Sequence, residues 1–172
     1  MTDTRFHGAL TWPVLLEERS SWNNRYFLDT EFTDFVQCQL LSIALVGESG
    51  CEFYGERSDY DSTLCSGFVR DVVLPQLGLI EGRAMPFDLL RDAIRLWFGG
   101  IPAISEPVLC YDYETDLNLL RFLLDGPLPR GWALEYIAGR CDARRRAAYF
   151  ARHGGEHHAL HDARANAYAF VG

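Results

Sequence analysis

Three short apolar and aromatic segments, separated only by turns, constrain the fold of this chain more than any other feature. They read RYFLDTEF over residues 25–32, QLLSIALV over residues 39–46 and CEFYGE over residues 51–56. Segments of this length, rich in aromatic and β-branched side chains, are typical of strands. The GESG before the third segment is typical of a tight turn. Three consecutive strands joined by short turns predict an antiparallel meander.

Beyond the meander the hydrophobic period lengthens from two residues to between three and four, which favours amphipathic helices. The predicted elements are helices over residues 68–77, 86–98, 116–124, 141–153 and 158–170, a short buried strand over residues 108–111, and a loop-rich stretch over residues 125–139. A strand meander followed by alternating helices and strands predicts an α/β fold, with a central mixed sheet flanked by helices.

The length of 172 residues suits one domain. No apolar run approaches the roughly 18–20 residues of a membrane span, and the N-terminal residues lack the basic and apolar segments of a secretory signal. The five cysteines are scattered and form no CxxC pair, which favours reduced thiols over disulfides or structural zinc. We therefore expect a cytoplasmic protein without a membrane partner.

The charge balance is acidic, with 24 Asp and Glu against 16 basic residues, all of them arginine, and a net charge of −8. Proteins that bind nucleic acid through broad contacts are usually basic. A site that gathers carboxylates to hold divalent cations also counts as negative until its metals are added. The charge therefore argues against clamping of a long duplex, but it does not exclude a nucleic-acid binder whose site holds metals.

Asp29 and Glu31 form the first candidate site, a DTE motif at the end of the first predicted strand. Side chains two residues apart on a strand point to the same face, with backbones roughly 6–7 Å apart. Two carboxylates among aromatic residues cost free energy unless a cation lies between them. Taken alone, the motif is more simply interpreted as two solvated acids at a strand end, because so short a match is frequent by chance.

Asp112 and Asp116 in VLCYDYETDLNLL form the second candidate site. Either residue could place a carboxylate where a strand ends and the next helix begins. Asp116 could equally be a first-turn acid that complements the helix dipole, and taken alone this interpretation is the simpler one.

The run HHALHDAR supplies the third candidate site. His157 and Asp162 are five residues apart, which is about 140° around a helix, so they can serve one site only if His157 lies before the helix. The preceding Gly154–Gly155 pair makes such a turn natural. Two alternatives remain at this point: a zinc site from His157 and His161 on one helical face, which lacks the Glu of an HExxH motif, or simple surface histidines.

Four acids in a fixed order, with a histidine five residues before the last, resemble the DEDDh family of 3′–5′ exonucleases, which has a ribonuclease H-like fold. The acids are Asp29, Glu31, Asp116 and Asp162. YFLDTEF, LLSIALVGESGCEFYGE, FVRDVVLPQLG and HHALHDAR look like the small bacterial exoribonuclease subgroup typified by a mycobacterial enzyme.

The resemblance covers most of residues 25–169. We interpret residues 1–24, which have no identified counterpart, as an N-terminal extension of unknown role, and residues 25–172 as the exonuclease domain.

The resemblance implies hydrolysis of phosphodiester bonds from 3′ ends, with release of nucleoside 5′-monophosphates. Two Mg²⁺ or Mn²⁺ ions roughly 3.5–4 Å apart activate the water and stabilise the leaving oxygen in such sites, and these hard cations take oxygen ligands. By resemblance, the four acids hold the ions and His157 is the general base, a role that suits a side chain with a pKa near neutral. Asp112, at a position where many family members carry Asn, is a possible auxiliary, and His158 and His161 are the nearest competitors of His157.

The resemblance also suggests residues that hold the 3′-terminal nucleotide. Phe32 and Leu41 are candidates for stacking or wedging, although both are equally good core residues, and Thr30 lies between the first two acids. Arg164 could reach a phosphate or brace the acids. The dense basic stretch, Arg140 with residues 144–146, is more simply a solvated helix face or a subunit contact.

The metal site does not distinguish sugars, since a contact to the 2′-hydroxyl is needed for that. The subgroup favours RNA over single-stranded DNA, and subgroup and family together imply a homodimer. Three alternatives are a DNA-directed exonuclease, a catalytically silent nuclease-like module that binds nucleic acid or protein, and a zinc-binding interaction domain. The leading hypothesis, a metal-dependent 3′–5′ exonuclease, predicts that His157→Ala abolishes cleavage and that His158→Ala largely spares it.

Overall fold

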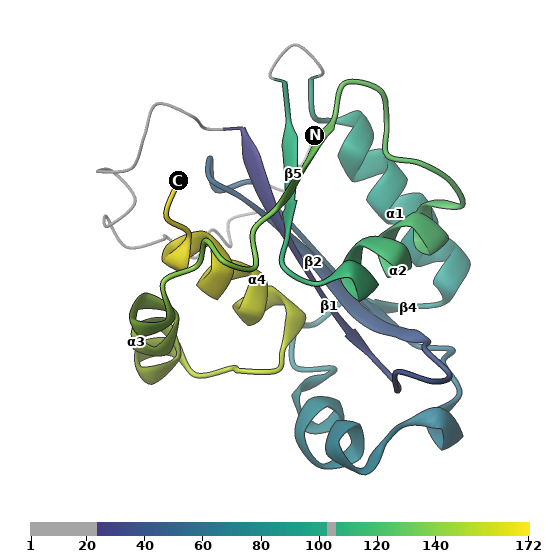
Figure 1. Ribbon diagram of the computed structural model, residues 1–172. Coiled ribbons are helices and arrows are strands. Elements are labelled where there is room, and N and C mark those ends of the chain that lie inside the picture. The colour runs from purple at the N-terminus through teal and green to yellow at the C-terminus, as the bar shows by residue number, and fades with distance from the viewer. Residues whose placement is uncertain (1–23, 103–105) are drawn as a thin grey trace, which may run out of the picture.

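The structure is a computed structural model that describes residues 24–102 and 106–172 (Figure 1). The extension predicted over residues 1–24 lies, but for Asn24, outside the described residues, and its boundary stays a prediction. The strands are β1 Arg25–Phe32, β2 Leu40–Gly47, β3 Glu52–Arg57, β4 Ala84–Met85, β5 Val108–Tyr111 and β6 Ala133–Tyr136. The α-helices are α1 Phe87–Gly99, α2 Glu114–Leu124, α3 Ala143–His153 and α4 Ala159–Ala169.

The strands form one mixed sheet in the order β4-β3-β2-β1-β5-β6. The first three strands pair antiparallel, as the meander predicts, and β5 and β6 then add parallel to β1. This confirms the predicted α/β class, and the arrangement agrees with a ribonuclease H-like fold.

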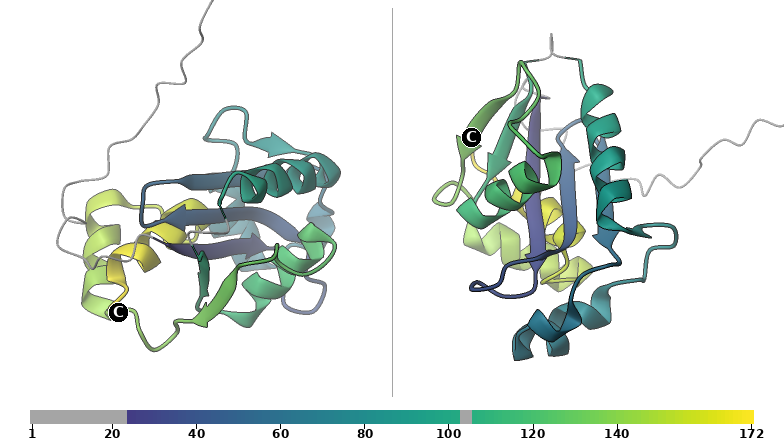
Figure 2. Two further views of the ribbon diagram at one scale, coloured as in Figure 1. Left: turned by 90° about the horizontal axis from the view of Figure 1, so that it is seen from above. Right: turned by 90° about the vertical axis from the view of Figure 1, so that its right-hand side faces the viewer.

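Alternation along β1 and β2 divides the core between the two faces of the sheet. Leu28 and Ile43 face α1 and α2, whereas Phe27 and Ala44 face α4. Figure 2 shows α1 and α2 on one side of the sheet and α3 and α4 on the other. In the part of the chain that the structure describes, no helix combines the length and apolar character needed to cross a bilayer.

Three segments differ from the sequence predictions. The short strand β4 was not predicted. Residues 68–77 are helical but irregular, with a π-helix at Val69–Val73 and a 3₁₀-helix at Leu74–Gln76. Pro75 explains the change in winding, because proline has no N–H to donate and its ring clashes with the preceding turn. The stretch 125–139, predicted as loop-rich, contains β6, which pairs with β5 from Val108 to Tyr111.

An open edge of β1 positions the candidate site. β5 pairs with β1 only from Arg25 to Phe27, and β1 continues to Phe32. No strand among the described residues pairs with that side of β1 after Phe27. The register of the pair places Asp29 level with Asp112, the first residue after β5. Side chains from β1, from the end of β5 and from helices on both faces can therefore meet there.

Candidate metal centre

Asp29 and Glu31 lie on the face of β1 that packs against α4. They alternate with Leu28 and Thr30, of which Leu28 packs toward α1 and α2. Both acids are half-buried, so their carboxylates lie between the sheet and α4 with limited access to water.

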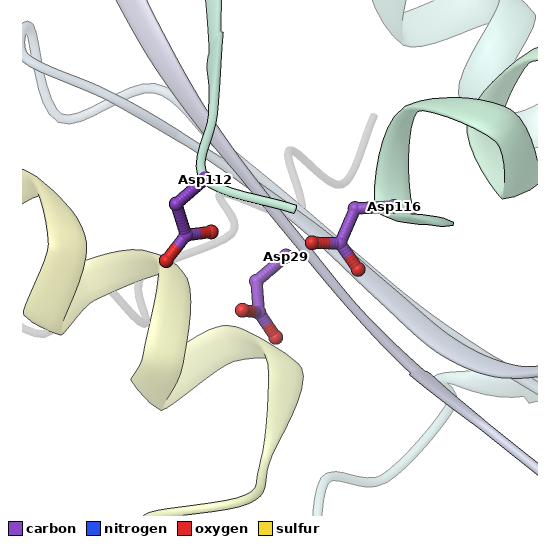
Figure 3. Close-up of side chains that lie close together, drawn as sticks. All are labelled: Asp29, Asp112 and Asp116. Atoms are coloured by element: carbon purple, nitrogen blue, oxygen red, sulfur yellow. The ribbon is translucent and has the colours of Figure 1, made fainter. Parts of the chain in front are cut away.

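Asp112 and Asp116 approach Asp29 from the end of β5 and the first turn of α2 (Figure 3). Asp116 is only 4% exposed, and the hydroxyl of Thr30 donates a hydrogen bond of 2.6 Å to its Oδ1. Thr30 therefore orients the carboxylate of Asp116. Its predicted contact with the substrate stays a prediction.

Asp162 lies in the first turn of α4 and is also 4% exposed. Its Oδ2 accepts a hydrogen bond of 3.0 Å from the backbone N–H of His158, and its Oδ1 accepts one of 2.8 Å from Nη2 of Arg146. The carboxylate is thus held from both sides.

These residues form two groups whose carboxylate oxygens lie within 4.8 Å of one another. One group is Asp29, Asp112 and Asp116, and the other is Asp29, Glu31 and Asp162. Asp29 belongs to both. We call the five residues the acid cluster.

Burial raises the pKa values of the acid cluster, and repulsion from neighbouring carboxylates adds to the rise for Asp29, Glu31 and Asp116. Burial, and then the charges of Asp116 and Asp162, raise the pKa of Asp29 well above its ordinary value. Burial raises the pKa of Glu31 to about 8, and the same two neighbours add to the effect. The pKa of Asp162 is also raised by burial, to about 6, although Arg146 opposes the shift. The carboxylates therefore repel one another and would be stabilised by a cation.

The chemistry of the donor set fits Mg²⁺ or Mn²⁺. All of the donors in both groups are carboxylate oxygens, which hard divalent cations prefer over nitrogen or sulfur. A shared carboxylate between two groups suits a pair of ions. The predicted set Asp29, Glu31, Asp116 and Asp162 is thus brought together, and Asp112 joins it.

His157 lies before α4, as its proposed role requires. It follows the Gly154–Gly155 pair and adopts a positive φ of 65°, a conformation uncommon for a residue with a side chain. Its carbonyl accepts a hydrogen bond from Gln76, and its exposed ring meets Phe68 edge to face at 4.9 Å. Its backbone N–H and, when the ring is protonated, its charge oppose the rise in the pKa of Asp162, so the two residues are close.

His158 has the opposite environment. The residue is 5% exposed, and its ring stacks on Tyr54 at 4.9 Å and places Nε2 3.1 Å from the Tyr54 hydroxyl. That hydroxyl donates to Glu56, so Nε2 of His158 is the donor in their contact. Burial lowers the pKa of His158. Its ring therefore supports the core, and its backbone supports Asp162.

The zinc alternative has no geometric support. His157 precedes α4 and His161 lies within it, so the two do not share a helical face. Of the groups of three or more possible metal ligands among the described residues, neither contains a histidine.

The other predicted substrate-binding residues have different surroundings. Leu41 is 0% exposed and packs with Cys65 and Val69, which favours the core alternative for it. Phe32 is partly buried, next to the acids, and stays a candidate. Arg164 forms a two-pronged ion pair with Glu52, with distances of 3.0 and 2.6 Å, so a phosphate contact for it stays a prediction without support from this placement.

Two features were not found by sequence reasoning. Arg146, one of three consecutive arginines, reaches Asp162 from α3. Phe35 and Tyr113 are 71% and 49% exposed. The ring of Phe35 meets the ring of Tyr113 edge to face at 6.2 Å and the ring of Phe32 edge to face at 5.1 Å, so the three rings form a series. Exposed aromatic side chains beside an acidic motif are a signal that could have indicated the second feature.

Comparison with known proteins gives a partial match. No protein-family model matches the chain. Over 54 residues the chain is 43% identical to proteins named 3′–5′ exoribonuclease from Mycobacterium tuberculosis strains CDC 1551 and H37Rv. The match covers 31% of this chain and 32% of each relative, so the chain spans about a third of the length of the curated relatives it matches.

Proposed function

We propose that this protein is a metal-dependent 3′–5′ exonuclease, and more specifically an exoribonuclease that releases nucleoside 5′-monophosphates. The observation that carries the proposal is the pair of carboxylate groups that share Asp29. The partial similarity to proteins named 3′–5′ exoribonuclease supports both the reaction and the RNA substrate. The cytoplasmic location and the homodimer stay predictions.

The positions of the residues support the roles that the family resemblance implies for them. Asp29, Glu31, Asp116 and Asp162 would hold two Mg²⁺ or Mn²⁺ ions, with Asp112 as an auxiliary ligand. When bound, such ions activate water and offset charge on the leaving oxygen.

The chain itself supplies the base and the orienting contacts. His157, exposed on the turn before α4, accepts the proton of the attacking water. Thr30 and the backbone of His158 fix the orientations of Asp116 and Asp162.

The exposed aromatic residues Phe35 and Tyr113 complete the proposal together with Phe32. A base that is not stacked in a duplex can pack on aromatic rings, and each such contact contributes about 1–3 kcal/mol. The aromatic series begins at Phe32, directly after Glu31, and ends at Tyr113, directly after Asp112. We therefore assign it to the 3′-terminal bases of a single strand.

The test compares RNA and DNA oligonucleotides of one sequence, labelled at the 5′ end and incubated with Mg²⁺ or Mn²⁺. We expect stepwise shortening from the 3′ end, faster for RNA, and no cleavage of a circular RNA of the same sequence. Shortening of DNA alone would select the DNA-directed alternative. A folded protein that shortens neither substrate with either metal would contradict an enzymatic function.

A further inference from the structure

Arg146 contributes a positive charge to the acid cluster from the protein itself. It projects from α3, and its Nη2 lies 2.8 Å from Oδ1 of Asp162. The Asp162 side chain is 6% exposed, whereas that of Arg146 is 36% exposed. A nearly buried carboxylate is thus paired with a guanidinium at the edge of the site.

The contact competes for an oxygen that a metal ion needs. Oδ2 of Asp162 is already bonded to the backbone N–H of His158, which is fixed at the start of α4. Oδ1 is bonded to Arg146. A cation held by Asp29, Glu31 and Asp162 must therefore share or replace one of these two contacts, and the side chain of Arg146 is the one that can move.

Arg146 is held less firmly than a structural arginine in the same molecule. Arg164 reaches Glu52 with two hydrogen bonds, at 3.0 and 2.6 Å. Arg146 makes one hydrogen bond to Asp162 and lies over the ring of Phe150 at 5.2 Å, and its buried Nε has no hydrogen-bond partner among the described residues. One hydrogen bond to Asp162, with Nε of Arg146 left without a partner among the described residues, suits a contact that another cation can replace.

We propose that Arg146 and a divalent cation exchange at Asp162, so that the guanidinium balances the carboxylate in the metal-free protein and is displaced when the ion binds. The proposal rests on the metal site of the proposed function. Two positive charges cannot lie on one carboxylate without repulsion, which is strong where water is excluded. Arg146 therefore weakens the binding of the ion while it protects the metal-free fold.

The first test measures Mn²⁺ affinity by calorimetry, without substrate. Arg146→Gln removes the competing charge and is expected to tighten Mn²⁺ binding by about tenfold. Arg146→Lys keeps the charge and is expected to stay close to the wild type. Arg144→Gln is the matched control, because Arg144 is exposed on the same helix and its loss changes the net charge equally.

The second test measures unfolding temperature with EDTA and with saturating Mn²⁺. Arg146→Gln leaves the buried Asp162 without its partner, so the variant is expected to unfold at a lower temperature in EDTA. With Mn²⁺ the ion replaces the guanidinium, and this deficit is expected to disappear. An equal deficit under both conditions would show a merely structural role and overturn the exchange.

The outcomes separate this proposal from the proposed function. Unchanged or weaker Mn²⁺ binding by Arg146→Gln overturns the exchange, even if the wild type shortens RNA. Tighter binding by this variant, together with no shortening of any substrate, supports the exchange and contradicts the exonuclease. A wild type that binds no Mn²⁺ overturns both.

Discussion

Charged side chains gather at two places along β1, and the protein balances them in different ways. At the start of the strand, Glu135 pairs with Arg25 and Arg140, and both guanidiniums also lie over the ring of Phe170. We call these four residues the Glu135 cluster. At the end of the strand, the acid cluster places carboxylates against carboxylates.

The pKa values follow this difference. Burial acts to raise the pKa of Glu135, but Arg25 and Arg140 lower it overall. Burial and neighbouring acids raise the pKa of Asp29 and of Glu31. Charge that serves the fold is neutralised within the chain, whereas the repulsion left in the acid cluster is available to bind a cation. The predictions below test this division.

The largest expected effect is the loss of activity in Asp29→Asn. Asp29 belongs to both carboxylate groups, so its loss weakens both ion sites, and several kcal/mol of transition-state stabilisation correspond to a factor of about 10³ or more. Single-turnover cleavage of labelled RNA measures this loss. Denaturant unfolding in EDTA should show no loss of stability, because a repulsive charge is removed. A marked loss of stability would place Asp29 with the structural charges.

His157→Ala is expected to slow cleavage by about 10²–10⁴-fold, the usual contribution of a general base. The matched control is His153→Ala, since His153 is also exposed, at the end of α3. His158→Ala, which the sequence suggests as the control, is unsuitable because its ring is buried against Tyr54 and its loss should lower stability. The pH dependence of cleavage is the second measurement. If His157→Ala cleaves at the wild-type rate, another residue is the base.

Phe35→Ala tests whether an exposed aromatic ring beside the acid cluster binds RNA, in contrast to the covered ring of Phe170. Phe170 is covered by two guanidiniums, whereas Phe35 is 71% exposed beside the acid cluster. Loss of a stacked base is expected to weaken binding of single-stranded RNA by about 1–3 kcal/mol. Fluorescence anisotropy with a labelled oligonucleotide in Ca²⁺ measures it. Leu96→Ala, an exposed residue on α1, is the control, and equal binding by both variants would remove Phe35 from the binding surface.

Glu135→Gln is expected to lower the free energy of unfolding by about 1–2 kcal/mol, because it weakens charged hydrogen bonds to two arginines. Urea unfolding with and without Mn²⁺ measures the change, which should be the same in both. Cleavage per folded molecule should equal that of the wild type. A loss of activity without a loss of stability would contradict the assignment of Glu135 to the fold and not to the metal site.

The smallest effect is a pH dependence in Glu31→Gln. The pKa of Glu31 in the folded state, about 8, lies above its value in the unfolded chain, so the folded state binds this proton more tightly. Wild-type stability in EDTA should therefore fall as pH rises from about 5 to 8, and the variant should lose less stability over this range because it lacks the titrating carboxyl group. Urea unfolding across this range measures the difference. If the stability of the two proteins changes equally with pH, the pKa of Glu31 is not raised by folding.

Local patterns predicted most of the fold. The meander and the helices are periodic in sequence, and their observed ends lie within two residues of the predicted ones. β6 was missed because most of its side chains are exposed, so it has no apolar alternation, and it forms by backbone pairing to β5. Residues 68–77 carry a helical period, but Pro75 changes how the backbone is wound.

The candidate site divides in the same way. Asp29 and Glu31 were predicted to share a face because strand alternation is local, and His157 was predicted to precede its helix because of the glycines before it. The contact of Arg146 with Asp162 depends on how α3 packs on α4, which no local pattern specifies. Leu41 was ambiguous for a similar reason, since only tertiary packing shows that it is covered.

The distance along the chain between Asp29 and Asp162 has a consequence for how such a protein is made. β1 is the first element that the structure describes and α4 is the last helix, yet their acids share one group. A chain still emerging during synthesis has β1, β5 and α2 before it has α4. Contacts this distant in sequence form late, after the entropy of closing the intervening chain has been overcome. A site assembled in this way stays incomplete until α4 has been synthesised and has packed on the sheet, so no shorter nascent chain can form the carboxylate group that contains Asp162.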